Sequence, residues 1–181
     1  MKKEILSIPN IIGYCRILSL PVFLYQYYHA DTIEEYIATF VFLAVIFLSD
    51  AVDGFIARKY NMITNLGKIL DPVADKLVQG CLAIAVSFRN PTMKIFFAVF
   101  VCKELYMGFM GLYLLKSKDS INGAQWYGKV CTAVVDVFIL ILLFVPTISL
   151  DISELMIGIM VVLEIFSLGM YIRFHRSVLH N

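Results

Sequence analysis

The chain has 181 residues, of which 60% are hydrophobic and 16% are charged, whereas soluble domains average about 45–50% apolar and about 25% charged residues. This excess of apolar residues excludes an ordinary soluble protein. Fifteen Lys and Arg against fourteen Asp and Glu give a formal net charge of +1, so the charge balance indicates no nucleic-acid partner, and the length is that of a single domain, residues 1–181.

Six apolar stretches come close to the length of about 20 residues that a membrane-spanning helix needs. In chain order they are Ile11–Tyr28, Tyr36–Phe55, Val73–Phe88, Met93–Leu115, Val130–Val145 and Leu155–Ile172. The second and third each have one polar end that carries aspartates. Residues 1–9 combine two lysines with apolar residues and favour a short interfacial helix. The sequence therefore predicts an all-α fold, a polytopic integral membrane bundle of six transmembrane helices with a short amino-terminal interfacial segment.

The distribution of basic residues predicts the orientation of these spans, because Lys and Arg accumulate in cytoplasmic loops. With the amino terminus inside, the outer loops hold only Arg89 and Lys94. The cytoplasmic segments hold eleven basic residues: Lys2, Lys3, Arg58, Lys59, Lys68, Lys76, Lys116, Lys118, Lys129, Arg173 and Arg176. Both termini are therefore expected on the cytoplasmic side of the cell membrane, as is the connection between the second and third spans, over about residues 58–76.

Four aspartates lie at the facing ends of the second and third spans. Asp50 and Asp53 are three residues apart, and Asp71 and Asp75 are four apart, so each pair shares one face of its helix. The short connection lets the two faces converge. Four neighbouring carboxylates need a cation to offset their repulsion, and a set of oxygen ligands favours Mg²⁺, Mn²⁺ or Ca²⁺ over zinc. Two such ions suit phosphoryl transfer, because a metal pair stabilises both the attacking and the leaving oxygen.

Two small residues and a cation accompany these aspartates. Gly54 and Ala57 remove side-chain bulk where a nucleotide would approach the backbone, and the permanently charged Arg58 suits a phosphate or carboxylate partner. The alternative is that the acids form structural ion pairs with Arg16, Arg58 or Lys76. Asp136 and Glu164 lie deep in the last two predicted spans, and we expect them to make a polar contact with another helix or with a second copy of the chain rather than to act in catalysis.

From Asp50 to Asp75 the sequence matches D-x2-D-G-x2-A-R-x8-G-x3-D-x3-D. This pattern resembles, at every fixed position, the signature of the CDP-alcohol phosphatidyltransferases, which are six-helix membrane enzymes, commonly homodimers, with the signature on the cytoplasmic side. The resemblance implies that Asp50, Asp53 and Asp71 are metal ligands for two Mg²⁺ or Mn²⁺ ions. It also implies that Asp75 is the general base and contacts the second ion.

The resemblance further implies a substrate and a reaction. The residues expected to contact the lipid substrate, CDP-diacylglycerol, are Asn10, Gly54, Ala57, Arg58, Thr64 and Gly67. Asp75 would take a proton from an acceptor alcohol, and the alcohol oxygen would then attack the β-phosphoryl group of CDP-diacylglycerol and expel CMP.

The acceptor alcohol is less clearly indicated. The segments around Pro9 and Gly67 resemble the branch that contains phosphatidylglycerophosphate synthases and cardiolipin synthases. Bacterial phosphatidylglycerophosphate synthases usually carry two further basic residues, at the positions that Gly111 and Cys131 occupy in this chain. The missing cations favour phosphatidylglycerol as acceptor, since a dianionic acceptor needs several cationic donors. Glycerol 3-phosphate stays slightly ahead because four cations remain near the cytoplasmic side, namely Arg16, Lys76, Lys103 and Lys129.

An ion-coupled membrane transporter is the alternative from another class, because carboxylates within a membrane often mark ion pathways. Such proteins carry carboxylates near the bilayer midplane, on broken helices and often within inverted repeats. In this chain the four aspartates cluster at one membrane edge, and no internal repeat is visible. The sequence therefore favours an enzyme that works on the bilayer with CDP-diacylglycerol and an alcohol as partners.

Overall fold

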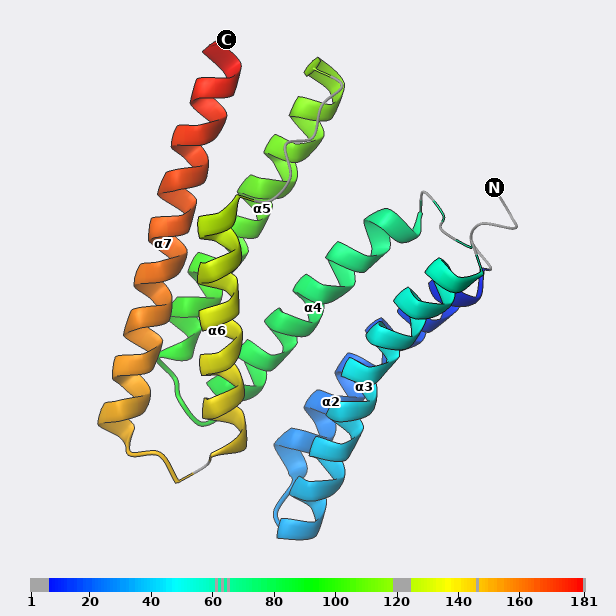
Figure 1. Cartoon of the computed structure of the whole chain (residues 1–181). Helices are drawn as coiled ribbons and strands as arrows, with labels where there is room; N and C mark the ends of the chain where they lie inside the picture. Colours follow the sequence, from blue (N-terminus) through cyan, green and yellow to red (C-terminus); the bar gives the residue numbers. More distant parts are fainter. Residues whose placement is uncertain are drawn as a thin grey trace. The chain divides into compact units, whose positions relative to one another are not determined.

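The computed structural model describes residues 7–60, 62, 64, 66–118, 125–145 and 147–180. Over these residues the chain folds into helices only, with no strand, as the sequence predicts (Figure 1). In chain order the helices are α2 (Ile8–His29), α3 (Ile33–Lys59), α4 (Gly67–Ser87), α5 (Met93–Lys118), α6 (Trp126–Phe144) and α7 (Leu150–His180). The predicted interfacial helix over residues 1–9 lies mostly outside the described residues, and Ile8 and Pro9 belong to α2.

Five of the described helices are long and apolar enough to cross a bilayer, namely α2, α3, α5, α6 and α7. The remaining helix, α4, has 21 residues, which suffices in length for a span. Its first half, however, contains Lys68, Asp71, Asp75 and Lys76, and these charges exceed what an apolar span usually carries. The described part of the chain is therefore a polytopic helical membrane fold with one helix that is polar at its start.

Local signals explain why the helices begin where they do. At the start of α2, Pro9 occupies the first turn, where its missing N–H costs nothing. At the start of α3, Thr32 and Glu35 form a capping box: the Glu35 N–H donates to the Thr32 hydroxyl, and the Thr32 N–H donates to the Glu35 carboxylate. Both helices therefore start several residues before the apolar stretches that predicted them.

The connection between α3 and α4 is shorter than the predicted segment of about residues 58–76. The α3 helix continues through Asp53 and Arg58 to Lys59, and α4 starts at Gly67. The prediction was wrong here because charged residues end an apolar stretch but do not end a helix. All four aspartates lie on α3 and α4, as their spacing of three and four residues predicts.

The helices group into two compact units, residues 1–81 and 82–181, and α4 contributes to both. In the first unit α2 and α3 pack along each other (Figure 1), with Phe23 and Leu43 fully buried. The Cys81 thiol donates to the Leu20 carbonyl oxygen at 3.6 Å and so ties α4 to α2. This bond places the carboxyl-terminal half of α4 beside the middle of α2.

In the second unit α7 packs against both α5 and α6. Phe96, Ile139 and Met160 are fully buried between these helices. The unit also contains a buried ion pair, in which the ammonium of Lys103 on α5 lies 2.8 Å from the carboxylate of Glu164 on α7. The predicted polar contact of Glu164 with another helix is thus confirmed.

Candidate functional site

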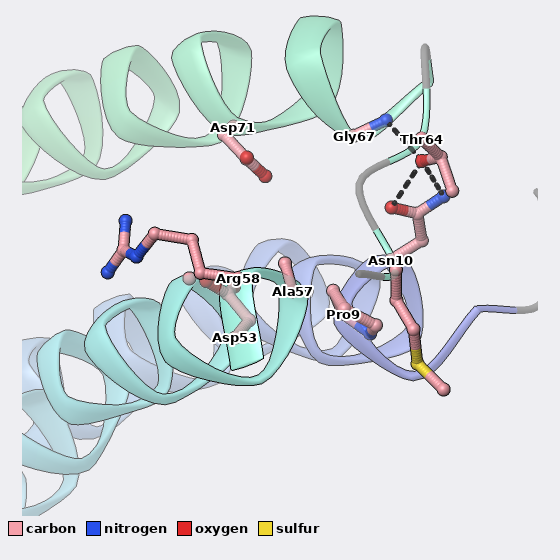
Figure 2. A pocket seen from close by; sticks show the side chains of 10 residues that line it. Pro9, Asn10, Asp53, Ala57, Arg58, Thr64, Gly67 and Asp71 are labelled. Atoms are coloured by element: carbon pink, nitrogen blue, oxygen red, sulfur yellow. Dashed lines mark hydrogen bonds between the residues drawn. The ribbon is translucent and has the colours of Figure 1, made fainter. Parts of the chain in front are cut away.

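A pocket opens in the first unit where the start of α2, the end of α3 and the start of α4 come together (Figure 2). Eight of the residues that the sequence singles out line it: Asn10, Asp53, Gly54, Ala57, Arg58, Thr64, Gly67 and Asp71. Pro9 and Met62 complete the lining. Pro9 could have been found from its place beside Asn10, whereas nothing in the sequence marks Met62.

A small hydrogen-bond network closes one side of this pocket. The Asn10 side chain, 2% exposed, lies 3.1 Å through its Nδ2 and 3.3 Å through its Oδ1 from the Thr64 hydroxyl. The same hydroxyl accepts a bond from the Gly67 N–H at 2.9 Å. This last bond satisfies one of the N–H groups that are left without a partner at the start of a helix. Thr64 therefore joins the start of α2 to the start of α4.

Gly67 is required by this close packing. A Cβ atom at position 67 would lie 2.9 Å from Oδ1 of Asn10 and 3.1 Å from Oγ1 of Thr64. Separations of that size are shorter than ordinary van der Waals contact, and the atoms in the way belong to a buried hydrogen-bonded pair. The glycine of the sequence pattern is therefore needed for the network to form.

On the α3 side, a small residue and a cation lie together. The Arg58 side chain is exposed, and its Nη2 lies 3.6 Å from where a Cβ of Gly54 would be. The guanidinium therefore extends back along α3 over Gly54, and both residues line the pocket with Ala57. An arginine in this place offers donors of suitable geometry to phosphate oxygens.

The four aspartates form two groups, and each group contains one residue from α3 and one from α4. Asp53 of α3 and Asp71 of α4 line the pocket, and Asp53 is 4% exposed. Asp50 and Asp75 both lie beside Arg16 of α2: its Nη1 donates to Oδ1 of Asp50 and lies 3.5 Å from Oδ1 of Asp75. The structural ion pair that the sequence left as an alternative is thus present at Arg16.

The donor set fits a hard divalent cation. All four candidate ligands are carboxylates, which Mg²⁺ and Mn²⁺ prefer. Oδ2 of the buried Asp53 has no hydrogen-bond partner within the described part of the chain, and a buried carboxylate oxygen is costly without a compensating positive charge. Over the described residues, no three His, Cys, Asp or Glu side chains already stand in a metal-binding arrangement. The chemistry of these carboxylates therefore fits a divalent cation, although two of the four, Asp50 and Asp75, are paired with Arg16 in this structure.

The four cations predicted to bind the acceptor have different surroundings. Arg16 is 3% exposed and donates a hydrogen bond to Asp50, and Lys76 donates to the Gln79 side chain at 3.2 Å. In the second unit, Lys103 is 3% exposed and paired with Glu164. Lys129 is exposed near the start of α6. Arg16 and Lys76 thus belong to the same unit as the pocket.

Comparison with known proteins gives one family. The model of the CDP-alcohol phosphatidyltransferase family matches residues 6–168. A Rickettsia bellii protein named CDP-diacylglycerol–glycerol-3-phosphate 3-phosphatidyltransferase is 30% identical over 115 residues, which cover 64% of this chain and 63% of that protein. The chain thus matches less than two thirds of the length of this relative.

Two further relatives extend this result. An Escherichia coli protein with the same name is 27% identical over 175 residues, which cover 94% of this chain and 96% of that protein. A Schizosaccharomyces pombe protein named as a fusion of cardiolipin synthase (CMP-forming) and a mitochondrial hydrolase is 34% identical over 90 residues, 50% of this chain and 14% of that protein. The names of these three relatives therefore include both a glycerol-3-phosphate phosphatidyltransferase and a cardiolipin synthase.

Proposed function

Because the chain belongs to the CDP-alcohol phosphatidyltransferase family and is an integral membrane protein, we propose that it is an enzyme of phospholipid biosynthesis. It transfers the phosphatidyl group of CDP-diacylglycerol to glycerol 3-phosphate and releases CMP. The observation that carries this proposal is the pocket, in which Asp53, Arg58 and Asp71 of the sequence signature line one space with the Asn10, Thr64 and Gly67 network.

The pocket binds the CDP end of the lipid substrate. Gly54 and Ala57 expose the backbone of α3 to the nucleotide, and the exposed Arg58 donates to its phosphate oxygens. Asn10 and Thr64 provide amide and hydroxyl groups on the opposite side of the pocket, next to the start of α4. The diphosphate is thereby held beside the carboxylates of the first unit.

Asp75 carries out the proton transfer. Its side chain is 60% exposed, so an acceptor hydroxyl can reach it from solvent or from the membrane surface. The carboxylate takes the hydroxyl proton, the acceptor oxygen forms a bond to the β-phosphorus, and the bond from that phosphorus to the oxygen of CMP breaks. Two divalent cations, Mg²⁺ or Mn²⁺, held by Asp50, Asp53, Asp71 and Asp75, would supply the positive charge that stabilises the attacking and leaving oxygens.

A specific observation favours phosphatidylglycerol, the acceptor of a cardiolipin synthase, as the second candidate. The ammonium of Lys103 is buried and paired with Glu164 at 2.8 Å, so its charge is already neutralised. A dianionic acceptor such as glycerol 3-phosphate needs several charged donors, whereas the single phosphodiester of phosphatidylglycerol needs fewer. Glycerol 3-phosphate remains the first candidate because it is named for the Rickettsia and Escherichia coli relatives.

The experiment that tests this proposal measures CMP release by the purified protein in detergent with CDP-diacylglycerol and Mg²⁺ or Mn²⁺. Glycerol 3-phosphate and phosphatidylglycerol are offered in separate reactions. Release with glycerol 3-phosphate supports the first candidate, and release with phosphatidylglycerol alone replaces it with the second. If neither alcohol gives CMP release, both proposed acceptors are wrong and another alcohol has to be sought. Omission of the divalent cation is the control, and it should remove all activity.

A further inference from the structure

Arg16 is an arginine buried among acids in the middle of a packed unit. Its side chain is 2% exposed, and its Nη1 bonds Asp50 and faces Asp75 at 3.5 Å. Its other donors, Nε and Nη2, are buried and have no hydrogen-bond partner among the described residues. One guanidinium thus serves two carboxylates and leaves part of its hydrogen-bonding capacity unused.

The charges around Arg16 explain why it is held there. Asp53 and Asp71 stand on the same helix ends as Asp50 and Asp75, so four negative charges meet one buried positive charge. A buried arginine is costly unless it is paired, and the aspartates repel one another without a cation between them. The pairing with Arg16 therefore relieves both costs at once.

The oxygen that Arg16 bonds is also an oxygen that a divalent cation needs. A guanidinium on Oδ1 of Asp50 and a cation coordinated by that atom exclude each other sterically, and their like charges repel. We propose that Arg16 is a positioning residue, the internal counter-ion of Asp50 and Asp75, which a divalent cation must displace. This inference rests on the proposed function, in which these aspartates bind the cation.

Displacement has a consequence that can be measured without substrate. Arg16 pairs with the two carboxylates when no cation is present, and it weakens cation binding by competition. Removing the charge of Arg16 should therefore strengthen the binding of Mn²⁺, whereas the loss of a side chain from a binding site ordinarily weakens binding. If Arg16 instead served only to hold α2 against α3 and α4, its removal would loosen the site and weaken binding.

The test is the binding of Mn²⁺ to purified protein in detergent, followed by electron paramagnetic resonance with neither lipid nor nucleotide present. Arg16→Gln should bind Mn²⁺ at least about tenfold more tightly than the wild type, because tenfold is the change expected on removing a unit charge roughly 6 Å from a divalent ion even in a water-like dielectric. Arg16→Lys retains the charge and should bind like the wild type. Arg89→Gln removes one positive charge beyond the other end of α4 and should change nothing.

Equal or weaker Mn²⁺ binding by Arg16→Gln would overturn the inference while leaving the proposed function intact. If the wild type bound no Mn²⁺, the proposed cation site would fall, and this inference with it. Should Arg16→Gln not fold, Mg²⁺ can be titrated into the wild type with ¹⁵N-labelled arginine side chains. The Arg16 signal, identified by its loss in Arg16→Lys, should shift as Mg²⁺ saturates, and a signal that stays in place would overturn the inference.

Discussion

At the scale of single residues, Asp75 is the group on which the proposed chemistry depends most directly. We expect Asp75→Asn to reduce CMP release by about a hundredfold or more, since loss of a general base removes a contribution of roughly that size. Binding of CDP-diacylglycerol should persist, because Asp75 is absent from the lining of the pocket. Steady-state CMP release and equilibrium binding of CDP-diacylglycerol check the two parts.

Asp151→Asn is the matched control, because Asp151 is an exposed acid in the first turn of α7. Its activity should equal that of the wild type. An Asp75→Asn variant that released CMP at the normal rate would remove Asp75 from the role of base.

Gly67 provides a second test, this time of substrate binding. In Gly67→Ala the new Cβ must displace the Asn10 amide or the Thr64 hydroxyl, and hydrogen bonds of this kind contribute about 0.5–1.5 kcal/mol each. We expect the KM for CDP-diacylglycerol to rise about tenfold while kcat changes little. Kinetics over a range of CDP-diacylglycerol concentrations separate the two constants.

Gly158→Ala is the matched control. It shows whether the addition of a methyl group to a helical glycine changes the KM by itself. Apart from its chain neighbours and the nearby backbone of its own helix, no atom of the described residues lies within 4 Å of a Cβ at position 158, so this variant should keep the KM of the wild type. An unchanged KM in Gly67→Ala would mean that the Asn10 and Thr64 network does not form part of the lipid-substrate site.

The sequence pattern predicted which residues belong to the candidate site, but it did not predict which of these residues lie next to one another. Spacing of three or four residues correctly places Asp50 with Asp53, and Asp71 with Asp75, on single helices. Spacing cannot say which residues meet across helices, because that depends on how the helices pack. Thus the arrangement of Asp53 with Asp71 at the pocket, and of Asp50 with Asp75 at Arg16, could be found only from the structure.

At the scale of helices, apolar length predicted six elements in the correct order but placed their ends too far inward. The windows for α2 and α3 began at Ile11 and Tyr36, whereas the helices start at Ile8 and Ile33. Proline at a first turn and a capping box extend a helix into polar sequence. The ends of the helices matter for function here, because every residue that lines the pocket comes from a helix end or from the connection between α3 and α4.

The contact between α5 and α7 yields a prediction at this scale. Glu164 is wholly buried and pairs with Lys103, so Glu164→Leu leaves the buried ammonium with only the more distant carboxylate of Glu104, at 3.5 Å. Removing one partner of such a pair destabilises a protein by about 3–5 kcal/mol, whereas replacing both can be neutral. We expect a clearly lower Tm in detergent for Glu164→Leu and recovery in the double variant Lys103→Met, Glu164→Leu.

The same double variant separates a structural role of Lys103 from a role in acceptor binding. If Lys103 only stabilises α5 against α7, the double variant should regain both its Tm and its KM for glycerol 3-phosphate. A recovered Tm with a KM that stays high would assign Lys103 to the acceptor, and a Tm that fails to recover would show that the ion pair contributes more than the neutralisation of two charges.

At the scale of the whole molecule, membrane topology depends on α4. Five of the described helices are apolar enough to span a bilayer on composition alone, and an odd number of spans would place the two termini on opposite sides. The 21 residues of α4 reach about 30 Å as a helix, enough to cross the hydrocarbon core. The charged residues of α4 all lie in its first half. Its second half is almost entirely buried within the protein, so few of its side chains have to face lipid.

We therefore predict six spans with both termini in the cytoplasm, in agreement with the excess of Lys and Arg in the segments on that side. Fusion of a reporter that fluoresces only in the cytoplasm to the carboxyl terminus, and separately to the amino terminus, should give signal from both fusions. A reporter inserted at residues 90–92, in the connection between α4 and α5, should give none. Signal from this insertion together with silence from the carboxyl-terminal fusion would mean that α4 does not cross. The aspartates of α4 would then lie on a helix at the membrane surface, and the acceptor would reach Asp75 from water alone.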